Sequence, residues 1–560
     1  MESVPLRNRI RAVIGGILRR RLMRDRDRFL QAAHDNCQHL QAATLQRILR
    51  LNADSRYSQT HGLSPQLTPE EFAKRMPVSD YESIRPAVEQ MQTGDHRALL
   101  GSGNRLLMFA TTSGTTGQSK LIPVTDHFLK CYRTGWQRWG IGAHQDHPEL
   151  KQLRMVQLSS DHESFFAADG TPCGNISGLV TAMQKPIVRK LYVVPGATAK
   201  ITQSEDRYHA ALRFALAERW VGMMVTANPA TLIRLLNIAA DRAEVLLRDI
   251  HDGTLSAETI PPAVHQQLTK RLRPNAPRAA QLQQILNQHG CFEPTAVWPS
   301  LCCLGVWTGG SAGAFRDALS ARFGPVPVRD HGLHASEGRM TIPIADETAA
   351  GLLDIESHYF EFLPVEQAES TSPTILPAHQ LTVGSEYFIL LTTCSGLYRY
   401  NIRDVVRCTG HFGTTPLLEF LHKGSSMSSI TGEKLSESQV IEAVRRSGHA
   451  ERLRRFTLSP VWGEPPGYRL YIDATGESLS PQQVAADVEQ SLRQLNCEYQ
   501  DKRESGRLAG IRCQQVSASD WEQFRRNRLR KSRGSEEQYK HPCLLPDPKF
   551  EDRFQESLSS

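Results

Sequence analysis

Apolar and polar positions alternate along this chain in two rhythms, which predict helices and strands in turn. The segment 27–52 spaces its apolar side chains three and four residues apart, as in a helix: Leu30, Cys37, Leu40, Leu45, Ile48 and Leu49. Asn228-Pro229 opens a second such run, which extends to Ile250. Short β-prone runs lie between helical ones, at residues 191–194, 358–365 and 387–393. This order predicts a mixed α/β architecture.

The pattern also predicts a domain boundary near residue 423. The segment 420–429 is rich in serine and follows a dense set of strands, and Lys423-Gly424 within it would serve as a hinge. Beyond it the chain predicts helices from Ser436, over 480–495 and from Ser519, and strands at 456–458, 468–473 and 510–516. We therefore expect a large N-terminal domain of packed sheets and helices, residues 1–422, and a smaller mobile α/β domain, residues 423–560.

Composition and charge narrow the classes of protein to which the chain can belong. A chain of 560 residues exceeds what one core usually supports, and 40% hydrophobic with 22% charged residues is ordinary for a globular protein. The net charge of +7 is too diffuse to indicate nucleic-acid binding. Eleven cysteines without a C-x-x-C pair predict reduced thiols and a cytoplasmic location.

The N-terminus is basic and carries Val13, Ile14, Ile17, Leu18 and Leu22 among arginines. This run is too short and too interrupted for a signal peptide or a membrane span. We expect an amphipathic helix that docks on the domain, without stable membrane association. An anchor on a membrane surface is the alternative.

A polar segment that ends in a lysine carries the main chemical signal. It lies between the apolar runs 106–110 and 121–124, which predict two strands. Glycines let backbone N–H groups approach a polyphosphate, hydroxyls add donors, and lysine adds a positive charge. The candidate ATP-binding residues in it are Thr112, Ser113, Gly114, Thr115, Thr116, Gly117 and Lys120.

This loop is not a Walker A sequence, because that motif runs from its lysine directly into a helix. Here the next helix is predicted only at Asp126, as its N-cap. A disordered polar linker of the same composition is the alternative.

A second constellation spans residues 330–338. Glu337 lies among small residues, including Ser336, as a Mg²⁺ ligand must if phosphate oxygens are to reach the same ion. The preceding Gly309-Gly310-Ser311, at a predicted strand end, places backbone groups where they could contact a base. A carboxylate at the start of a helix is the alternative for Glu337. We interpret His331 and His334 as structural, because a third metal ligand at a recognisable spacing is missing.

Two further positions complete the candidate site. Asp404 ends an aromatic and basic strand, and its two oxygens could accept both ribose hydroxyls. A salt bridge from Asp404 to Arg399 or Arg403 is the alternative. Lys540 precedes a proline-containing stop, which places it on a loop, although a plain surface charge has the same pattern.

Taken in order, these four elements resemble the motifs of adenylate-forming enzymes of the firefly-luciferase-like superfamily, and closely those of the auxin-responsive acyl-acid amido synthetase family. The resemblance rests on 112–120, on 334–338, on 398–404 and on 538–542, and it covers nearly the whole chain. It points to a bacterial-type member of the family.

The resemblance implies an ATP- and Mg²⁺-dependent ligase that works in two steps. A carboxylic acid attacks the α-phosphate of ATP and gives an acyl-adenylate, and an amine, typically of an amino acid, then attacks the acyl carbon. By the resemblance, Ser113, Thr115, Thr116 and Lys120 would hold the phosphates, Glu337 would bind Mg²⁺ and Asp404 the ribose. The other ATP-binding residues would be Gly310, Ser311, Ser336 and Lys423. Lys540 would stabilise charge at the α-phosphate, and the smaller domain would then swing about Lys423.

Two departures from the family pattern affect the nucleotide site. The family's second motif usually begins with an aromatic residue that stacks on adenine, and here Leu333 takes that position. Either Leu333 makes a plain apolar contact or another aromatic residue replaces the stacking. Asn401-Ile402-Arg403 replaces a small, glycine-bearing triplet, which makes the turn before Asp404 stiffer.

The substrates are less well specified than the reaction. Ser177 and Asn228 resemble acyl-pocket positions of the family, but both are also generic turn and helix-start residues. Transfer of the acyl group to a thiol or hydroxyl, or a non-catalytic ligand-binding relative, are the alternatives. The identity of the acid, the acceptor and the oligomeric state stay open.

Overall fold

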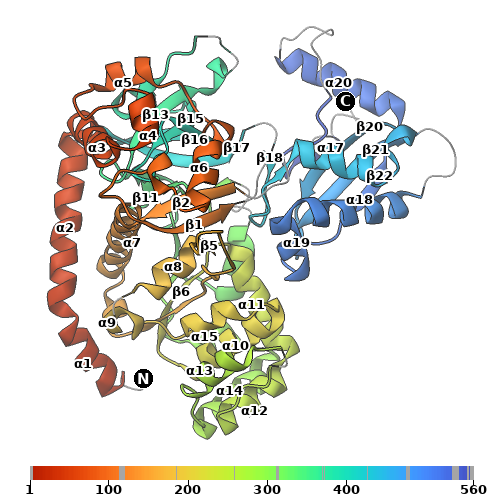
Figure 1. Cartoon of the computed structure of the whole chain (residues 1–560). Helices are drawn as coiled ribbons and strands as arrows, with labels where there is room; N and C mark the ends of the chain where they lie inside the picture. Colours follow the sequence, from red (N-terminus) through yellow and green to blue (C-terminus); the bar gives the residue numbers. More distant parts are fainter. Residues whose placement is uncertain are drawn as a thin grey trace. The chain divides into compact units, whose positions relative to one another are not determined.

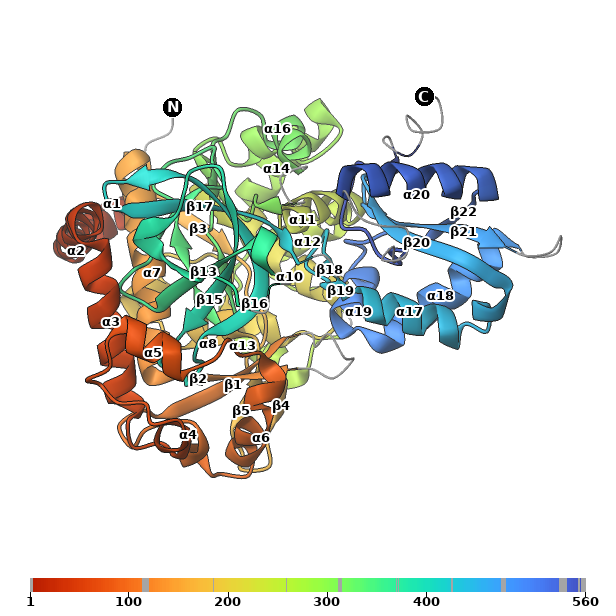
Figure 2. The ribbon, with the colours of Figure 1, turned by 90° about the horizontal axis from the view of Figure 1, so that it is seen from above.

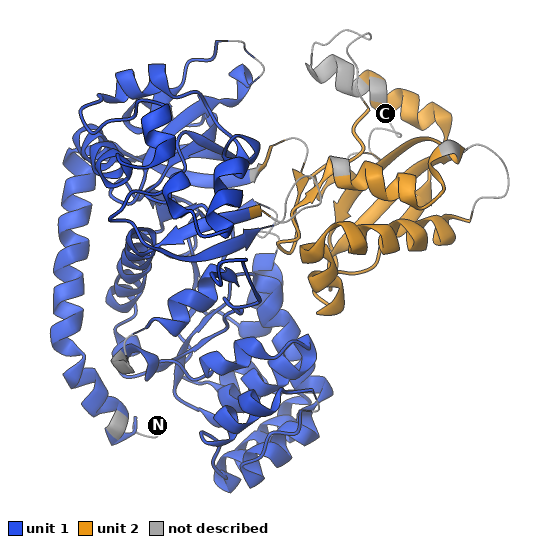
Figure 3. Cartoon of the chain, viewed as in Figure 1, with its two compact units in different colours: residues 1–112, 121–421 blue, residues 113–120, 422–560 orange. Residues whose placement is uncertain are grey.

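The structure is a computed structural model that describes residues 4–112, 120–184, 186–257, 259–310, 315–368, 370, 372–424, 427–474, 480–532, 541–551 and 554. The chain separates into two compact units (Figure 3): residues 1–112 with 121–421, and residues 113–120 with 422–560. Helices and strands are mixed in both, and the first unit is the larger, which confirms the predicted fold class. The assignment of ATP chemistry to residues 1–422 and of a mobile lid to residues 423–560 stays a prediction.

Three helices begin the first unit: α1 (Leu6–Ile14), α2 (Gly16–Asp35) and α3 (Cys37–Asn52). In Figure 1, α2 runs along the outer edge of this unit. The single helix predicted over 27–52 is interrupted at Asn36, where φ of −136° and ψ of 33° depart from helical values. Gln41 of α3 is buried and links this helix to the segment before β13. Its Nε2 donates hydrogen bonds to the carbonyl oxygens of Ile355 at 2.7 Å and His358 at 2.8 Å.

The N-terminal helix lies on the first unit, but not by its apolar side. Asn8 and Ala12 are buried, whereas Val13, Ile14 and Ile17 are 78%, 60% and 76% exposed. The helix therefore docks on the first unit, as predicted, although these exposed apolar residues do not make the contact. The reason is that a polar and a small side chain occupy the face that packs against the domain.

A four-stranded sheet of order β2-β1-β5-β4 carries the flanks of the candidate phosphate loop. Its strands are β1 (Leu106–Thr112), β2 (Lys120–Thr125), β4 (Phe165–Phe166) and β5 (Pro172–Gly174). Helix α7 (Asp126–Asp146) follows, and Thr125 rather than the predicted Asp126 is its N-cap. The Thr125 hydroxyl accepts a hydrogen bond from the Phe128 amide at 3.1 Å.

A parallel sheet of order β3-β6-β7-β8 forms a second part of this unit. Its strands are β3 (Arg154–Gln157), β6 (Val221–Val225), β7 (Cys303–Val306) and β8 (Val328–Asp330). The apolar core beside it also takes side chains from helices α10 (Ser204–Ala217), α11 (Pro229–Asp241), α12 (Ala243–Asp252), α13 (Pro262–Thr269), α14 (Ala276–His289) and α16 (Arg316–Phe323).

Two predictions in this region need correction. The helix expected from residue 228 to 250 is divided into α11 and α12, because Arg242, with φ of −113° and ψ of 24°, is not helical. The strand expected at 191–194 is absent from these described residues, where Tyr192 forms an isolated bridge with Met155.

The third sheet has seven strands in the order β11-β12-β17-β16-β15-β13-β14. Figure 2 labels β13, β15, β16 and β17 of this sheet. They are β11 (Thr341–Ile342), β12 (Gly351–Leu353), β13 (Tyr359–Pro364), β14 (Leu376–Pro377), β15 (Glu386–Thr392), β16 (Tyr400–Phe412) and β17 (Thr415–Lys423). The strands predicted at 358–365 and 387–393 are confirmed as β13 and β15. The remaining helices of the unit include α4 (Arg56–Thr60), α5 (Pro69–Arg75), α6 (Tyr81–Gln92) and α8 (Ile176–Ala182).

The second unit packs helices on a three-stranded sheet of order β20-β21-β22. Its elements include α17 (Glu437–Arg446), β20 (Leu453–Val461), β21 (Gly467–Ala474), α18 (Pro481–Leu495), α19 (Cys497–Glu504), β22 (Arg512–Gln515) and α20 (Ala518–Ser532). Each helix and strand predicted beyond residue 436 is confirmed within a few residues. Among the helices that can be described in either unit, none has the length and apolar character needed to cross a bilayer.

Candidate functional site

The candidate phosphate loop is flanked by two strands, as predicted. Thr112 is buried at the end of β1, and Lys120 begins β2. Ser113, Gly114, Thr115, Thr116 and Gly117 lie outside the described residues. The chain continues from Lys120 into a strand and not into a helix, which confirms that this is not a Walker A arrangement.

Glu337 occupies the turn of a tight hairpin. Strands β9 (His334–Ala335) and β10 (Gly338–Arg339) pair with Gly338 opposite Ala335, so Ser336 and Glu337 form the two-residue connection. The alternative of a helix-start carboxylate is therefore wrong. Glu337 is only 8% exposed, and no hydrogen bond or ion pair joins its carboxylate to any residue that the structure describes. Burial, together with the charge of Glu337, raises the pKa of the Tyr400 hydroxyl, so the hairpin lies close to the third motif.

Asp330 connects the two segments predicted to approach the nucleotide. Its Oδ2 accepts hydrogen bonds from the Thr308 amide at 2.5 Å and hydroxyl at 2.6 Å, and its Oδ1 accepts one from the Gly332 amide at 2.6 Å. Burial raises the pKa of this carboxyl to about 6 despite these donors. This role of Asp330 was not predicted, although an aspartate two residues before a glycine is a usable turn signal.

Gly310 has a conformation that suits glycine. Its φ is +59°, and a Cβ atom there would lie 2.6 Å from the carbonyl oxygen of Leu421. The neighbouring candidate Ser311 lies outside the described part of the chain.

An aromatic cluster lies beside the hairpin. His331 meets the rings of Trp136 and Trp139 edge-on, with centroids 5.0 Å and 5.5 Å away, and the ring of His334 lies 5.4 Å from Trp136 and 6.2 Å from Trp307. Desolvation, together with the positive charge of Arg339, lowers the pKa of His334 to about 4, and desolvation also lowers that of His331. Both histidines therefore pack as neutral rings in this cluster.

Leu333 is buried and offers no open surface for a base. Trp307, in contrast, is half-buried, and its Nε1 donates to the Gly309 carbonyl at 2.9 Å. Its ring also meets Phe420 edge-on, with centroids 5.3 Å apart. Trp307 was not predicted as the stacking residue, although an aromatic residue two positions before the glycine pair is a usable signal.

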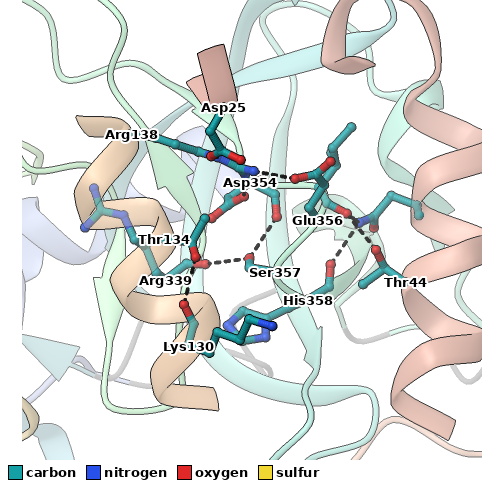
Figure 4. Close-up of polar contacts among 12 residues, drawn as sticks. Asp25, Thr44, Lys130, Thr134, Arg138, Arg339, Asp354, Glu356, Ser357 and His358 are labelled. Atoms are coloured by element: carbon teal, nitrogen blue, oxygen red, sulfur yellow. Dashed lines mark hydrogen bonds and ion pairs between the residues drawn. The ribbon is translucent and has the colours of Figure 1, made fainter. Parts of the chain in front are cut away.

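A cluster of ion pairs around the buried Arg138 and Asp354 is linked to strand β10 of the hairpin (Figure 4). Arg138 of α7 contacts Asp354 at 3.4 Å, Glu356 at 2.5 Å and Asp25 of α2 at 3.3 Å. The backbone of Arg339 accepts a hydrogen bond from the Ser357 hydroxyl at 3.3 Å, which joins this cluster to β10. Burial raises the pKa of Asp354 to about 6, and the charge of Arg138 opposes that rise.

The third motif contains an ion pair, but not one predicted for Asp404. Arg399 is buried and pairs with Glu361 of β13, Nε to Oε2 at 2.9 Å, so the alternative of an Arg399–Asp404 salt bridge is wrong. Asp404 itself is buried within β16.

The residue before Asp404 adopts a left-handed conformation. Arg403 has φ of +60°, and its amide donates to the side-chain oxygen of Asn401 at 2.8 Å. A side chain is strained at positive φ, whereas glycine is not. The stiffness predicted for this triplet therefore has a physical basis in the backbone conformation of Arg403.

The remaining predicted residues lie on separate elements. Ser177 lies in α8, where its hydroxyl accepts from the Ser160 amide at 3.2 Å, and Asn228 caps α11 by accepting from the Ala230 amide at 2.8 Å. Lys423 ends β17 and belongs to the second unit, and Lys540 lies outside the described residues. The roles given to these four residues stay predictions.

A cavity of about 800 Å³ lies elsewhere in the first unit. Helices α3 and α7 and the segment 354–357 line it, with Arg47, Lys130 and Cys131 among the lining residues. Its lining includes none of the predicted site residues, so this cavity lends no support to the candidate site.

Three family models match consecutive parts of the chain. The GH3 family N-terminal domain matches residues 26–328, the GH3 family central domain matches 351–423, and the GH3 family C-terminal domain matches 438–549. The first of these alone covers more than half of the chain.

Individual relatives agree with these matches. The chain is 24% identical to the indole-3-acetic acid-amido synthetase GH3.2 of Arabidopsis thaliana, over 82% of this chain and 88% of that protein. It is 25% identical to the jasmonoyl–L-amino acid synthetase GH3.5 of Oryza sativa subsp. japonica, over 80% of this chain and 83% of that protein. Both come from plants, which gives no support to the expectation of a bacterial-type member.

A solved structure shares the fold. The GH3.15 acyl acid amido synthetase superposes with a TM-score of 0.64 at 22% identity, over 95% of this chain and 94% of that one. With the family matches running in the same order along nearly the whole length, this chain belongs to the GH3 family.

Proposed function

We propose that this chain is an ATP-dependent ligase that adenylates a carboxylic acid and joins the acyl group to the amine of an amino acid. The relatives named above are amido synthetases of indole-3-acetic acid and of jasmonate, and a homologous GH3.15 structure holds the acid 2,4-DB. The observation that carries the proposal is Glu337 of the second motif, which is 8% exposed and whose carboxylate pairs with no residue that the structure describes.

That carboxylate fits a Mg²⁺ ligand. Magnesium is usually bound through one or two carboxylates together with substrate phosphates, and it keeps several waters. Glu337 is 8% exposed and no described cation pairs with its carboxylate, so a bound Mg²⁺ would supply the opposite charge. When bound, Mg²⁺ would neutralise charge on the phosphate oxygens, and the protein contributes the fixed position of Glu337 in its hairpin.

The phosphates would lie against the loop between β1 and β2. Its glycine amides and hydroxyls would donate to them, and Lys120 would add a positive charge. Asp404 would accept the ribose hydroxyls. Lys540, carried by the second unit, would stabilise the charge that develops at the α-phosphate as the acid attacks, and movement of that unit about Lys423 would then open the site to the amine.

Trp307 would supply the aromatic surface that Leu333 lacks. Alanine substitution of stacking aromatics costs about 1–3 kcal/mol per base in nucleic-acid sites, so Trp307→Ala is expected to raise KM for ATP about tenfold and to change kcat little. Initial rates at varied ATP would measure this, and Trp307→Phe is the matched control because it keeps a ring. An unchanged KM in the alanine variant would exclude Trp307 from the base site.

Pyrophosphate exchange across a panel of carboxylic acids tests the proposal as a whole. Exchange with at least one acid is expected, followed by an amide product when amino acids are added. A folded, ATP-binding protein that exchanges with no acid would support the non-catalytic alternative. Mass spectrometry with amino acids and coenzyme A together would separate amide from thioester formation.

We also propose a cytoplasmic location. All eleven cysteines are free thiols, and Cys302 and Cys303 are adjacent without being paired. Burial raises the pKa of the Cys302 thiol to about 12, which keeps it protonated and unreactive. Unpaired thiols in this number suit a reducing compartment.

A further inference from the structure

The first two helices expose a continuous row of large apolar side chains. Leu6, Ile10, Val13, Ile14 and Ile17 are 70%, 51%, 78%, 60% and 76% exposed. Their spacing of four, three, one and three residues places them on one face of the helical run. We call these five residues the apolar row. An exposed patch of this kind marks an interaction surface more often than chance exposure.

The opposite side of the same helices is fixed to the first unit. Asn8 and Ala12 are buried, and the Arg11 guanidinium donates to the carbonyl oxygens of Gln152 at 3.3 Å and Leu153 at 3.1 Å. Farther along α2, Phe29 is buried under Arg138, whose guanidinium carbon lies 4.1 Å from the ring centroid. Figures 1 and 2 both place α1 and α2 at the edge of this unit. The apolar row is therefore held facing solvent.

A row of arginines continues the apolar row along α2. Arg20, Arg21 and Arg24 follow Ile17 by three, four and seven residues, so they lie on the same face, and all three are exposed. Arg9 and Arg28 are exposed as well. The acidic residues nearby are fewer, and one of them, Asp25, is already paired with Arg138 at 3.3 Å. We call Arg20, Arg21 and Arg24 the basic row.

We propose that the apolar row and the basic row bind reversibly to the surface of an anionic lipid bilayer. An amphipathic helix lies in the interface when its apolar face enters the acyl boundary and its arginines meet anionic headgroups. An anionic bilayer surface offers acyl chains to the apolar row and negative headgroups to the basic row at the same time. A second copy of this chain would bring an identical basic row to the contact, where like charges repel.

The rows lie outside the part of the chain that carries the adenylation chemistry. The GH3 N-terminal domain match begins at residue 26, after the last residue of the basic row. The proposed activation of a carboxylic acid therefore uses none of the side chains in the apolar row or the basic row. Membrane binding does not depend on the proposed ligase activity, and each can fail without the other.

Co-sedimentation of the full-length protein with lipid vesicles tests this. We expect binding to vesicles of phosphatidylcholine mixed with phosphatidylglycerol, little binding to phosphatidylcholine alone, and a decrease as salt is added. The double variant Ile10→Glu, Ile17→Glu is expected to lose at least about tenfold in affinity, because two charges would enter the acyl boundary. Replacing Arg20, Arg21 and Arg24 by glutamine is expected to weaken binding roughly 100-fold.

The control is Val383→Glu, since Val383 is an apolar residue of the first unit with 57% exposure and lies outside both rows. It is expected to bind vesicles as the parent does. Unchanged melting temperatures in all variants would show that they fold. Absence of binding to anionic vesicles, or equal, salt-independent binding to neutral ones, would overturn the proposal. The proposal would also be overturned if the protein formed dimers without lipid and the Ile10→Glu, Ile17→Glu variant did not. That result would show that the apolar row binds a second copy of this chain.

Discussion

Replacing Glu337 with glutamine is expected to slow acid-dependent pyrophosphate exchange by about 10²–10³-fold, the range found when a charge-stabilising group is removed from an active site. Glutamine keeps the size of the side chain and one acceptor oxygen, so the hairpin between β9 and β10 is retained. What disappears is the negative charge that would hold Mg²⁺ against the phosphates. Because no described residue pairs with that carboxylate, the variant is expected to be at least as stable as the parent.

The informative measurement is exchange rate against Mg²⁺ concentration. If Glu337 binds the ion, the Mg²⁺ needed for half-maximal rate rises in the variant, and excess Mg²⁺ restores part of the activity. Glu366→Gln is the matched control, because Glu366 is exposed in the same unit and carries the same change of charge. Parental rate and parental Mg²⁺ dependence in Glu337→Gln would remove Glu337 from the site.

Arg399→Met is expected to destabilise the first unit by about 3–5 kcal/mol, the usual cost of removing one partner from a buried ion pair. The side chains of Arg399 and Glu361 are each 6% exposed. Arg399 also donates to the carbonyl oxygens of Ala73 at 2.9 Å and Met76 at 2.7 Å, which would lose their donor. Burial already raises the pKa of Glu361, and the charge of Arg399 opposes that rise.

Urea unfolding followed by circular dichroism would measure this loss. Arg407→Met is the control, because Arg407 and Glu386 form a pair with side chains 43% and 38% exposed, which is worth at most about 1 kcal/mol. Adding Glu361→Gln to Arg399→Met removes the stranded charge and is expected to restore part of the stability. A loss in Arg399→Met no greater than in Arg407→Met would contradict the buried-pair interpretation.

The elements of the second unit were predictable from the sequence because local signals agree with its fold. Ser436 and Ser480 both cap the helices that follow them, each with its hydroxyl accepting from the third residue on. The helix breaks at Asn36 and Arg242 were not predictable, because the apolar spacing continues on both sides of each. Helix periodicity reports which face is buried, and it is insensitive to one residue leaving the helical conformation.

The parts of the candidate site that could be predicted are those whose residues are close together in the sequence. The strands that flank the phosphate loop and the small residues around Glu337 are visible in the chain itself. The partner of Arg399 was not, because Glu361 lies 38 positions earlier and meets it only when β13 has paired in the sheet. The same holds for Trp307, whose ring is positioned by Phe420 from the far end of the first unit.

Helix α2 sets a limit on how far the beginning of this chain can be trimmed for crystallisation. Its second half gives Asp25 and the Phe29 ring to Arg138, the guanidinium that also contacts Asp354 and Glu356. A shortened protein that starts at residue 20 would lose the apolar row and retain both of these contacts. A protein that starts after Asp35 would lack both Asp25 and Phe29, so Arg138 would lose both contacts. The ion pairs next to the hairpin that carries Glu337 would then be held less firmly.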